Sequence, residues 1–583
     1  MIKKLLSYVR EYKKASILSP VFVMLEVVME VAIPVVMAGL IDKGIEKGDM
    51  GYILKSGSVL FIMSVFSLIF GALAGKNAAY ASSGFAKNLR KEMFHNIQTF
   101  SFKNIDKFST SSLITRLTTD VNHVQHAYQM IIRGAVRSPI MMSFSLVVAL
   151  SLCPTLGLVF LCAVPILAFG LIYISQKAHP IFEKVFKTYD GLNQIVGENL
   201  SGIRVVKLFN REEYEKNKFN NISYKIYDLF KKAEQLIALN MPLMQFTMYM
   251  CTLIISYLGA KMVVMSGNNP QLGLSTGELM SFITYTTQIL MSLMMISMTL
   301  VMITISRASA ERIIEVIDEE SSITSKEDGI KEVKNGDIKF NNVSFSYLDD
   351  KNKLCLTDIN IDIKSGETVG ILGGTGSGKT SVVSLIPRLY DVFSGSVEVG
   401  GHNVKDYDLD TLRNSVAMVL QKNTLFSGTI KENLKWGNEF ATDEELINAS
   451  KLSCAHDFIS DFPDGYDTYI EQGGTNVSGG QKQRLCIARA LLKSPKIIIL
   501  DDSTSAVDMG TDAKIRKAFK EQIPSITKII IAQRISSVQD ADKIIVIDDG
   551  KVVAVGTHKE LLSSCEIYKE VYESQKKGGD EDE

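Results

Sequence analysis

Long apolar runs in the N-terminal half of the chain constrain its fold more than any other feature. A helix needs about twenty apolar residues to cross a bilayer. Six segments are long enough, and they cover residues 16–41, 52–74, 131–153, 155–175, 236–265 and 276–305. Little more than Pro154 separates the third segment from the fourth, so we expect these two to form a tight hairpin. The sequence therefore predicts an all-α transmembrane domain of six helices over residues 1–315.

Two polar stretches between these segments, residues 75–133 and 176–235, are charged and have a helical pattern. They are too polar to cross the bilayer, so we expect the membrane helices to continue into water as long extensions. Their Lys and Arg content favours the cytoplasmic side. An even number of spans then places both termini in the cytoplasm of a multi-pass protein of the cell membrane. The basic N-terminus precedes an apolar run that is too long for a signal peptide and lacks a clear small-residue cleavage site.

Each cytoplasmic stretch contains a break in its helical pattern. Ser and Thr residues within 108–120 can cap a short amphipathic helix near 110–119. A second break lies at 199–210. Each break is either an ordinary turn between long helices or a helical tip that presses on the soluble domain. Their positions at the far ends of long hairpins favour the second interpretation.

The rest of the 583-residue chain has a soluble composition. A polar, acidic linker at 316–333 precedes β-branched runs that alternate with helical stretches, which predicts an α/β domain with a mainly parallel core at 334–575. Residues 576–583 lack apolar anchors, so we expect a disordered acidic tail. The 63 basic and 64 acidic residues do not suggest a nucleic-acid partner. The seven cysteines lack metal-ligand spacing and indicate neither disulfides nor structural zinc.

A glycine-rich run in the second domain has the pattern of a nucleotide-binding loop. It lies between a predicted buried strand at 367–372 and the start of a predicted helix at 381–386. Glycines let backbone N–H groups approach a polyphosphate, and the helix N-terminus adds partial positive charge. Lys379 can then bridge the outer phosphates, and the Thr380 hydroxyl can bind Mg²⁺. The run, which we call the phosphate loop, consists of Gly373, Gly374, Thr375, Gly376, Ser377, Gly378, Lys379 and Thr380.

A second nucleotide motif follows at 496–501, where a continuous apolar strand ends in Asp501. Such a strand fits a parallel sheet that is buried on both faces. The carboxylate at its end can hold Mg²⁺ through water. Alone this motif is weak evidence, but together with the phosphate loop it predicts a site for ATP and Mg²⁺.

Between the two motifs lies the sequence Ser478, Gly479, Gly480, Gln481, which resembles the signature of the ATP-binding cassette (ABC) superfamily. The resemblance covers essentially the whole chain, because six spans with long cytoplasmic hairpins precede one α/β P-loop domain, as in a half-transporter of the type IV ABC exporters. In that family two cassettes enclose two ATP molecules. Each site combines one chain's phosphate loop with the other chain's signature, whose helix points its positive end at the γ-phosphate. The resemblance therefore implies that this chain works with a second half-transporter.

The resemblance also assigns roles to single positions. Tyr347 matches the aromatic residue that stacks on adenine. Gln421 matches the glutamine that reaches Mg²⁺ and the attacking water. Asp508 lies in the loop that crosses to the partner subunit, and residues 471–474 lie where exporters carry a coupling segment.

Two positions depart from the family pattern. Asp502 stands where the family has a Glu that activates water as a base, and Gln533 stands where it has a His that contacts the γ-phosphate and that base. The shorter Asp withdraws its carboxylate by about an ångström, a misplacement that can cost on the order of a hundredfold in rate. Gln can form hydrogen bonds but cannot become cationic. Both changes predict slow hydrolysis at this chain's own site, as in the degenerate-site subunit of heterodimeric multidrug exporters, whose partner keeps the Glu and the His.

The transmembrane segments contain two groups of candidates for the transport path. Glu26 and Glu30 share one face of the first span. They either contact a cationic, lipophilic substrate or pack against Arg133 or Arg137, because intramembrane carboxylates usually face a cavity or a partner. Methionines suit a surface that accepts varied apolar ligands, although a methionine stripe is also common in ordinary packing. The last span and its approach contain Met280, Met291, Met294, Met295, Met298 and Met302, of which we single out Met295 and Met298.

These features together predict a bilayer-embedded subunit of an ATP-driven exporter, with drug-like lipophilic compounds as its small-molecule substrates. One alternative is a homodimeric exporter of lipids or peptides that works slowly with Asp as its base. Another is an ATP-gated channel or regulator built on the same cassette. An importer is disfavoured because the membrane domain and the cassette are fused in this order.

Overall fold

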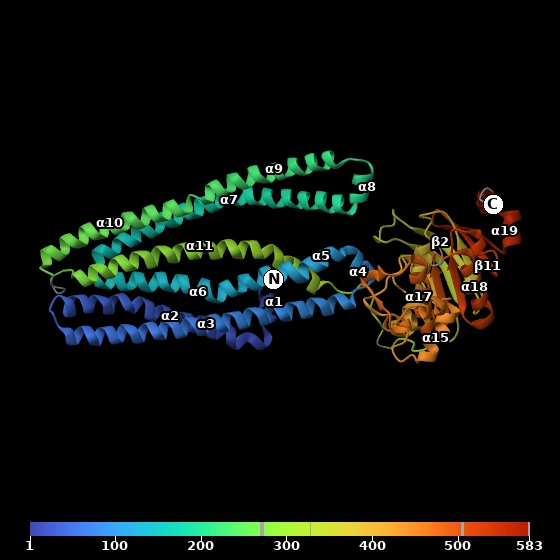
Figure 1. Cartoon of the computed structure of the whole chain (residues 1–583), viewed down its shortest axis with the longest axis horizontal. Coiled ribbons are helices and arrows are strands. Elements are labelled where there is room, and N and C mark those ends of the chain that lie inside the picture. The colour runs from blue at the N-terminus through green and yellow to red at the C-terminus, as the bar shows by residue number, and fades with distance from the viewer. Residues whose placement is uncertain (269–272, 327, 503–506, 581–583) are drawn as a thin grey trace. The chain divides into compact units, whose positions relative to one another are not determined.

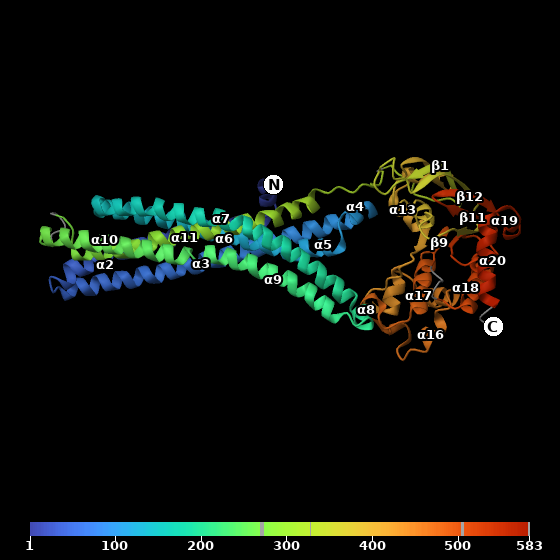
Figure 2. The same cartoon turned by 90° about the horizontal axis from the view of Figure 1, so that it is seen from above.

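The computed structural model describes residues 1–268, 273–326, 328–502 and 507–580, and it contains two compact units (Figures 1 and 2). The first unit consists of Met1–Gln98 and Thr110–Glu319. The second consists of Thr99–Ser109 and Glu320–Glu583. The first unit is helical and the second contains all the described β-strands.

Long apolar helices build the first unit. Within the described residues, six helical segments are long and apolar enough to cross a membrane, which confirms the six predicted spans. Each segment is much longer than the roughly 20 residues that a bilayer requires, because the helices continue into the polar stretches between the apolar runs. The six segments are Arg10–Ile45, Met50–Thr99, Thr110–Leu152, Pro154–Ser201, Glu212–Ser266 and Thr276–Asp318.

The helices of the first unit pack around a shared apolar core. The core combines side chains of several helices, and within it Phe160 stacks on Phe282 with ring centroids 6.2 Å apart. Pro154 begins α7, because the first helical position tolerates a residue without an N–H, and this start separates α7 from α6. Figures 1 and 2 show α7 and α9 running side by side towards α8. The α-helices are α1 (Ile2–Ser7), α2 (Lys13–Gly39), α3 (Met50–Thr99), α5 (Thr110–Thr115), α6 (Val121–Leu152), α7 (Pro154–Ser201), α8 (Ile203–Leu208), α9 (Glu212–Ile237), α10 (Asn240–Ser266) and α11 (Thr276–Asp318).

A short helix between α3 and α5, α4 (Phe102–Lys107), belongs to the second unit. A capping box between Ser101 and Asn104 begins this helix. The Asn104 amide also donates to the Glu320 carbonyl at 3.0 Å, which ties α4 to the start of the linker. The prediction that the tip of this hairpin lies at 110–119 is therefore wrong in position. Thr110–Thr115 forms α5 in the first unit, and the helix that joins the soluble unit precedes it.

The second unit contains a six-stranded sheet with the order β12-β11-β3-β10-β9-β6. The strands from β11 to β6 are parallel, and β12 at the edge is antiparallel. A second sheet, with the order β2-β1-β4-β5, is antiparallel, and β7 pairs with β8. The predicted α/β domain with a mainly parallel core is confirmed. The strands are β1 (Ile338–Phe345), β2 (Leu356–Ile363), β3 (Thr368–Leu372), β4 (Ser394–Val399), β5 (His402–Asn403), β6 (Val416–Val419), β7 (Gly428–Thr429), β8 (Tyr469–Ile470), β9 (Ile497–Asp501), β10 (Thr527–Ile531), β11 (Lys543–Asp548) and β12 (Lys551–Gly556).

Helices cover the central sheet, so every residue of β9 and β10 is buried. The helices of the second unit after α4 are α12 (Lys379–Ser384), α13 (Leu409–Ser415), α14 (Ile430–Lys435), α15 (Asp443–Leu452), α16 (His456–Ser460), α17 (Gly479–Leu492), α18 (Met509–Gln522), α19 (His558–Ser564) and α20 (Glu566–Asp580). The last of them corrects the prediction of a disordered tail at 576–583, because α20 remains helical to Asp580. Extending an existing helix adds one hydrogen bond per residue and needs no apolar anchor. Residues 581–583 lie outside the described chain.

Candidate functional site

Four adjacent parallel strands of the central sheet end at the same edge. They are β3, β10, β9 and β6. The phosphate loop follows β3, and Asp501 is the last residue of β9. Gln533 and Gln421 each lie two residues beyond the ends of β10 and β6. Ligands of open α/β sheets bind at this carboxyl edge, so the strand order brings four of the predicted positions together.

The phosphate loop requires glycine at particular positions. Gly376 and Gly378 have φ angles of +83° and +97°, a region that other residues rarely adopt. A Cβ atom on Gly378 would lie 2.6 Å from Cδ2 of Leu356, whereas one on Gly374 would meet no atom within 4 Å. Gly378 directly precedes α12, so the loop leads into the start of a helix.

The polar side chains of the loop fit a polyphosphate. Lys379 Nζ donates to the carbonyls of Gly373 and Gly374 at 2.8 and 2.6 Å. Burial lowers the pKa of Lys379, although the charges of Asp501 and Asp502 oppose this effect. The buried Ser377 hydroxyl has no hydrogen-bond partner within the described part of the chain. A half-buried cation, an unpaired hydroxyl and glycine N–H groups suit phosphate oxygens.

Thr380 and Asp501 form the predicted metal pair. The Thr380 hydroxyl donates to Asp501 Oδ2 at 2.9 Å. Asp501 is only 2% exposed. Burial is the main cause that raises its pKa, and the charge of Asp502 raises it further, while the bond from Thr380 and the charge of Lys379 act in the opposite direction. A hydroxyl and a carboxylate are oxygen ligands that Mg²⁺ prefers, so this donor set fits the ion.

The carboxylate of Asp502 lies beside two amide side chains. Gln533 Nε2 donates to Asp502 Oδ2 at 3.0 Å, and Gln421 Nε2 donates to the same oxygen at 3.4 Å. The backbone of Asp502 has a φ of +47°, a left-handed conformation that short polar residues tolerate best. The fold therefore brings together the position of the family Glu that activates water, the position of the His that contacts the γ-phosphate, and the Gln that reaches the attacking water.

Tyr347 follows β1 in the antiparallel sheet and keeps 41% of its surface exposed. Its hydroxyl lies 2.8 Å from Ser381 Oγ, one residue beyond Thr380. Its ring makes edge contacts with Phe345 and Tyr390, with centroids 4.7 and 5.2 Å apart. A partly exposed ring of this kind can stack on a base.

Comparison with known proteins relates this geometry to a family. Residues 16–293 match the ABC transporter transmembrane region, and residues 356–505 match the ABC transporter domain. The chain is 37% identical to the uncharacterized ABC transporter ATP-binding protein YfiB of Bacillus subtilis, over 98% of each chain. It is 34% identical to an uncharacterized ABC transporter ATP-binding protein of Mycobacterium tuberculosis, over 99% of this chain and 98% of the relative.

The chain belongs to the ABC transporter family. A solved structure of a bacterial Atm1-family ABC exporter with ATP bound has the same fold, with a TM-score of 0.80, although the sequences are 23% identical. The match covers 97% of this chain and 98% of that chain. This ABC transporter is therefore a half-transporter with the type IV exporter fold, in which a multi-pass membrane unit and one ATP-binding ATPase domain share a chain. Half-transporters of this family commonly pair as dimers in the lipid bilayer.

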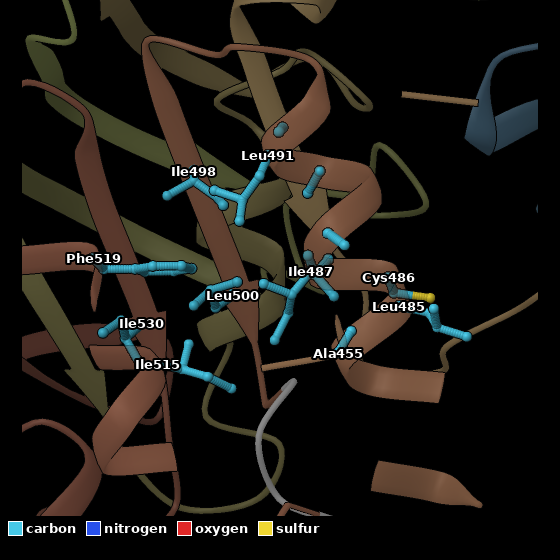
Figure 3. Close-up of a cluster of buried hydrophobic side chains, with 14 of the residues drawn as sticks. Ala455, Leu485, Cys486, Ile487, Leu491, Ile498, Leu500, Ile515, Phe519 and Ile530 are labelled. Carbon is cyan, nitrogen blue, oxygen red and sulfur yellow. The ribbon is translucent and has the colours of Figure 1, made fainter. Parts of the chain in front are cut away.

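The ABC signature begins α17. Ser478 caps this helix, and a capping box forms because the Gln481 side chain accepts from the Ser478 N–H at 2.9 Å. Ser478 and Gly479 are exposed, so another subunit can reach the helix N-terminus. Further along α17, Leu485, Ile487 and Leu491 belong to the buried cluster that also contains Ile498, Leu500, Ile515, Phe519 and Ile530 (Figure 3). This cluster fixes the direction of the signature helix relative to β9.

The other ABC assignments in this domain make local contacts. Asp508 caps α18, where its Oδ1 accepts from the Thr511 N–H at 2.8 Å. The preceding loop residues 503–506 lie outside the described chain. In the segment 471–474, Glu471 Oε2 accepts from the Thr475 hydroxyl at 2.7 Å.

In the membrane unit, both candidate carboxylates bind the same arginine. Arg137 Nη1 contacts Glu26 Oε1, and Arg137 Nη2 donates to both Glu30 oxygens at 2.8 and 2.7 Å. Glu26 is buried, and its Oε2 has no hydrogen-bond partner within the described residues. Of the two alternatives for these carboxylates, this contact corresponds to packing against Arg137. Of the six methionines, four are exposed along one face of α11, namely Met280, Met291, Met295 and Met298.

Sequence reasoning missed one contact between α4 and the ATP-binding domain. The Tyr390 hydroxyl donates to Asp106 Oδ2 at 2.7 Å. No motif marks either residue, and 284 positions separate them in the chain. Only the position of α4 in the second unit reveals the pair.

Proposed function

We propose that this chain is one subunit of a heterodimeric ABC exporter. Its own site binds ATP and Mg²⁺ but hydrolyses ATP slowly, and its signature completes the hydrolytic site of a partner that carries the usual Glu and His. The termini and the ATP-binding domain lie in the cytoplasm.

The contact of Gln533 with Asp502 carries this proposal. Both residues depart from the family pattern, and they touch each other at 3.0 Å. A shortened carboxylate and a side chain that cannot become cationic thus occupy one hydrolytic centre. The binding groups around Lys379, Thr380 and Asp501 keep contacts that suit nucleotide and metal. This combination of kept binding groups and altered hydrolytic groups supports ATP retention over turnover.

The test is the ATPase rate of the purified full-length chain, alone and in complex with the partner that copurifies from native membranes. We expect a slow rate for the chain alone and a fast rate for the complex. The paired change Asp502→Glu and Gln533→His should raise the rate of the chain alone by about tenfold or more, because it restores both groups. A fast rate for the chain alone that Asp502→Asn abolishes would overturn the proposal and favour the homodimer.

For the substrate, we propose drug-like lipophilic compounds that contact the exposed face of Met291, Met295 and Met298 on α11. Flexible thioethers adapt to apolar ligands of different shapes. We assign Glu26 and Glu30 to the packing of α2 against α6 through Arg137. ATP-driven accumulation of a lipophilic dye in inverted vesicles tests the pump. Equilibration without accumulation would indicate a channel.

A further inference from the structure

We propose that Tyr390 is a positioning residue for ATP. Tyr390 holds the ring of Tyr347 at the base site, by which we mean the place where the nucleobase of ATP would stack, and it connects that ring to α4. The inference rests on the proposed ATP site, in which Tyr347 stacks on the base. Tyr390 lies between α12 and β4 and belongs to none of the motifs described above.

On the side of the ATP site, Tyr390 joins a cluster of three aromatic rings. Its ring centroid lies 5.2 Å from that of Tyr347 at an interplanar angle of 88°, and 5.6 Å from that of Phe345 at 57°. Aromatic pairs of this geometry have a preferred orientation, so neighbouring rings restrict one another. The Tyr347 hydroxyl is already held by Ser381 at 2.8 Å. Tyr347 is thus fixed at its hydroxyl end by α12 and along its ring by Tyr390.

On the side of α4, Tyr390 makes two contacts with the same helix face. Its hydroxyl donates to Asp106 at 2.7 Å, and its ring lies 6.0 Å from that of Phe102. Residues 102 and 106 are four positions apart, so their side chains are neighbours on a helix. Burial and the bond to Asp106 raise the pKa of Tyr390, so its hydroxyl remains protonated and able to donate at physiological pH.

These contacts make α4 and the base site mutually dependent. A displacement of α4 would move Tyr390 and loosen the ring of Tyr347. Conversely, a base that orders Tyr347 would favour the present position of α4, because coupling between two sites acts equally in both directions. In the chain, α4 interrupts the connection between α3 and α5 of the membrane unit. Through the contacts of Tyr390, the nucleobase of ATP can therefore influence the connection between α3 and α5, independently of the phosphates.

The first experiment compares two probes on the purified full-length chain in lipid nanodiscs, namely ATP and inorganic tripolyphosphate, which lacks the base. We expect Tyr390→Ala to weaken ATP binding by about fivefold or more and to leave tripolyphosphate binding within about twofold, since the loss concerns base stacking alone. An equal loss for both probes would show a merely structural role and overturn the inference. Unchanged ATP binding in this variant would also overturn it.

Tyr347→Ala separates this inference from the proposed function. If Tyr347→Ala weakens ATP binding but Tyr390→Ala does not, the role of Tyr390 fails and the base site stands. If Tyr347→Ala leaves ATP binding unchanged, the base site itself fails, and the inference fails with it.

A double-mutant cycle tests the connection to α4. Tyr390→Phe keeps the ring and removes the hydroxyl, and Asp106→Ala removes the acceptor. We expect each to weaken ATP binding by about twofold to threefold, and the pair to weaken it no more than either alone, because both break one contact. Lys103→Ala is the matched control, since it breaks the ion pair of α4 with Asp349 without touching Tyr390. If the effects of Tyr390→Phe and Asp106→Ala add, the connection is overturned. It is also overturned if Lys103→Ala and Tyr390→Phe together weaken binding no more than either alone.

Discussion

Asp501 and Asp502 are neighbours in the chain but have different surroundings. Asp501 is almost fully buried and accepts a hydrogen bond from Thr380. Asp502 lies beside the amides of Gln421 and Gln533. A buried carboxylate costs stability unless a cation compensates it, so without a bound cation Asp501 destabilises the fold.

This cost predicts an effect of pH on stability. The pKa of Asp501 is raised above its ordinary value of 3.8, so the folded chain holds this proton more tightly than the unfolded chain. The stability that this proton contributes is fully present below the pKa of Asp501 in the unfolded chain. It is lost as the pH rises through the raised pKa in the folded chain. Without Mg²⁺ or nucleotide, we expect Asp501→Asn to melt at a higher temperature than the wild type at pH 7.

The advantage of Asp501→Asn should shrink as the buffer becomes more acidic, because the wild-type carboxylate then takes up its proton. Mg²⁺ with ATP should raise the melting temperature of the wild type more than that of the variant. Differential scanning fluorimetry over a pH series measures both effects. A variant that is less stable than the wild type at pH 7 would contradict the argument.

Two glycines of the phosphate loop should respond differently to substitution by alanine. Gly378→Ala should weaken ATP binding by at least about tenfold, because a left-handed backbone costs an L-residue about 1–2 kcal/mol and the new Cβ also meets Leu356. Gly374→Ala is the matched control, with open space around its Cβ, and should stay within about twofold of the wild type. Equilibrium binding of a fluorescent ATP analogue measures both, and equal losses would contradict the prediction.

At the scale of elements, Arg137 joins α2 to α6 through two carboxylates. Arg137→Leu leaves these carboxylates without their cation and should lower the free energy of unfolding on the order of 3 kcal/mol. The triple variant Glu26→Gln, Glu30→Gln and Arg137→Leu should recover most of this loss because no charge remains. Thermal unfolding in nanodiscs measures the difference, with Arg133→Leu as a control on the same helix. If Arg137→Leu and Arg133→Leu unfold alike, the ion pairs do not hold the helices together.

Most elements could be predicted from the sequence because their signals are local. Apolar runs of sufficient length mark the spans, and an apolar strand before a polar loop marks each strand that ends at the site. The position of α4 could not be predicted in this way. Its capping box has Asn104 where the usual pattern has Glu or Gln, and the Ser and Thr residues at 108–120 give a stronger but misleading signal.

The contacts within the candidate site required the fold. The contact of Gln533 with Asp502 exists because β10 lies between β3 and β9, and the order of parallel strands leaves no local trace in the sequence. The family resemblance implies that the residue at 533 contacts the one at 502, but whether Gln533 and Asp502 keep this contact in this chain could be seen only in the fold. The contact of Tyr390 with Asp106 could not be predicted either, because 284 positions separate the two residues and no motif marks them.

At the scale of the whole molecule, an ABC half-transporter contributes two half-sites that can be disabled separately. In the proposed arrangement, the phosphate loop binds this chain's own ATP, and the signature contacts the ATP of the partner. In a homodimer every site needs both parts, so a change in either part disables every site. In the proposed heterodimer, the fast site needs this chain's signature and the partner's phosphate loop.

Variants of the complex should therefore differ in effect. Lys379→Ala disables this chain's slow site and should lower ATPase turnover by less than about threefold, whereas Ser478→Ala removes a donor from the fast site and should lower it by about tenfold or more. Ser478 also caps α17, so Thr442→Ala, which removes the cap of an equivalent capping box on α15, controls for loss of a helix cap. Thr442→Ala should leave turnover near the wild-type rate. If Lys379→Ala and Ser478→Ala abolish turnover equally, both parts serve every site, and the two subunits are equivalent.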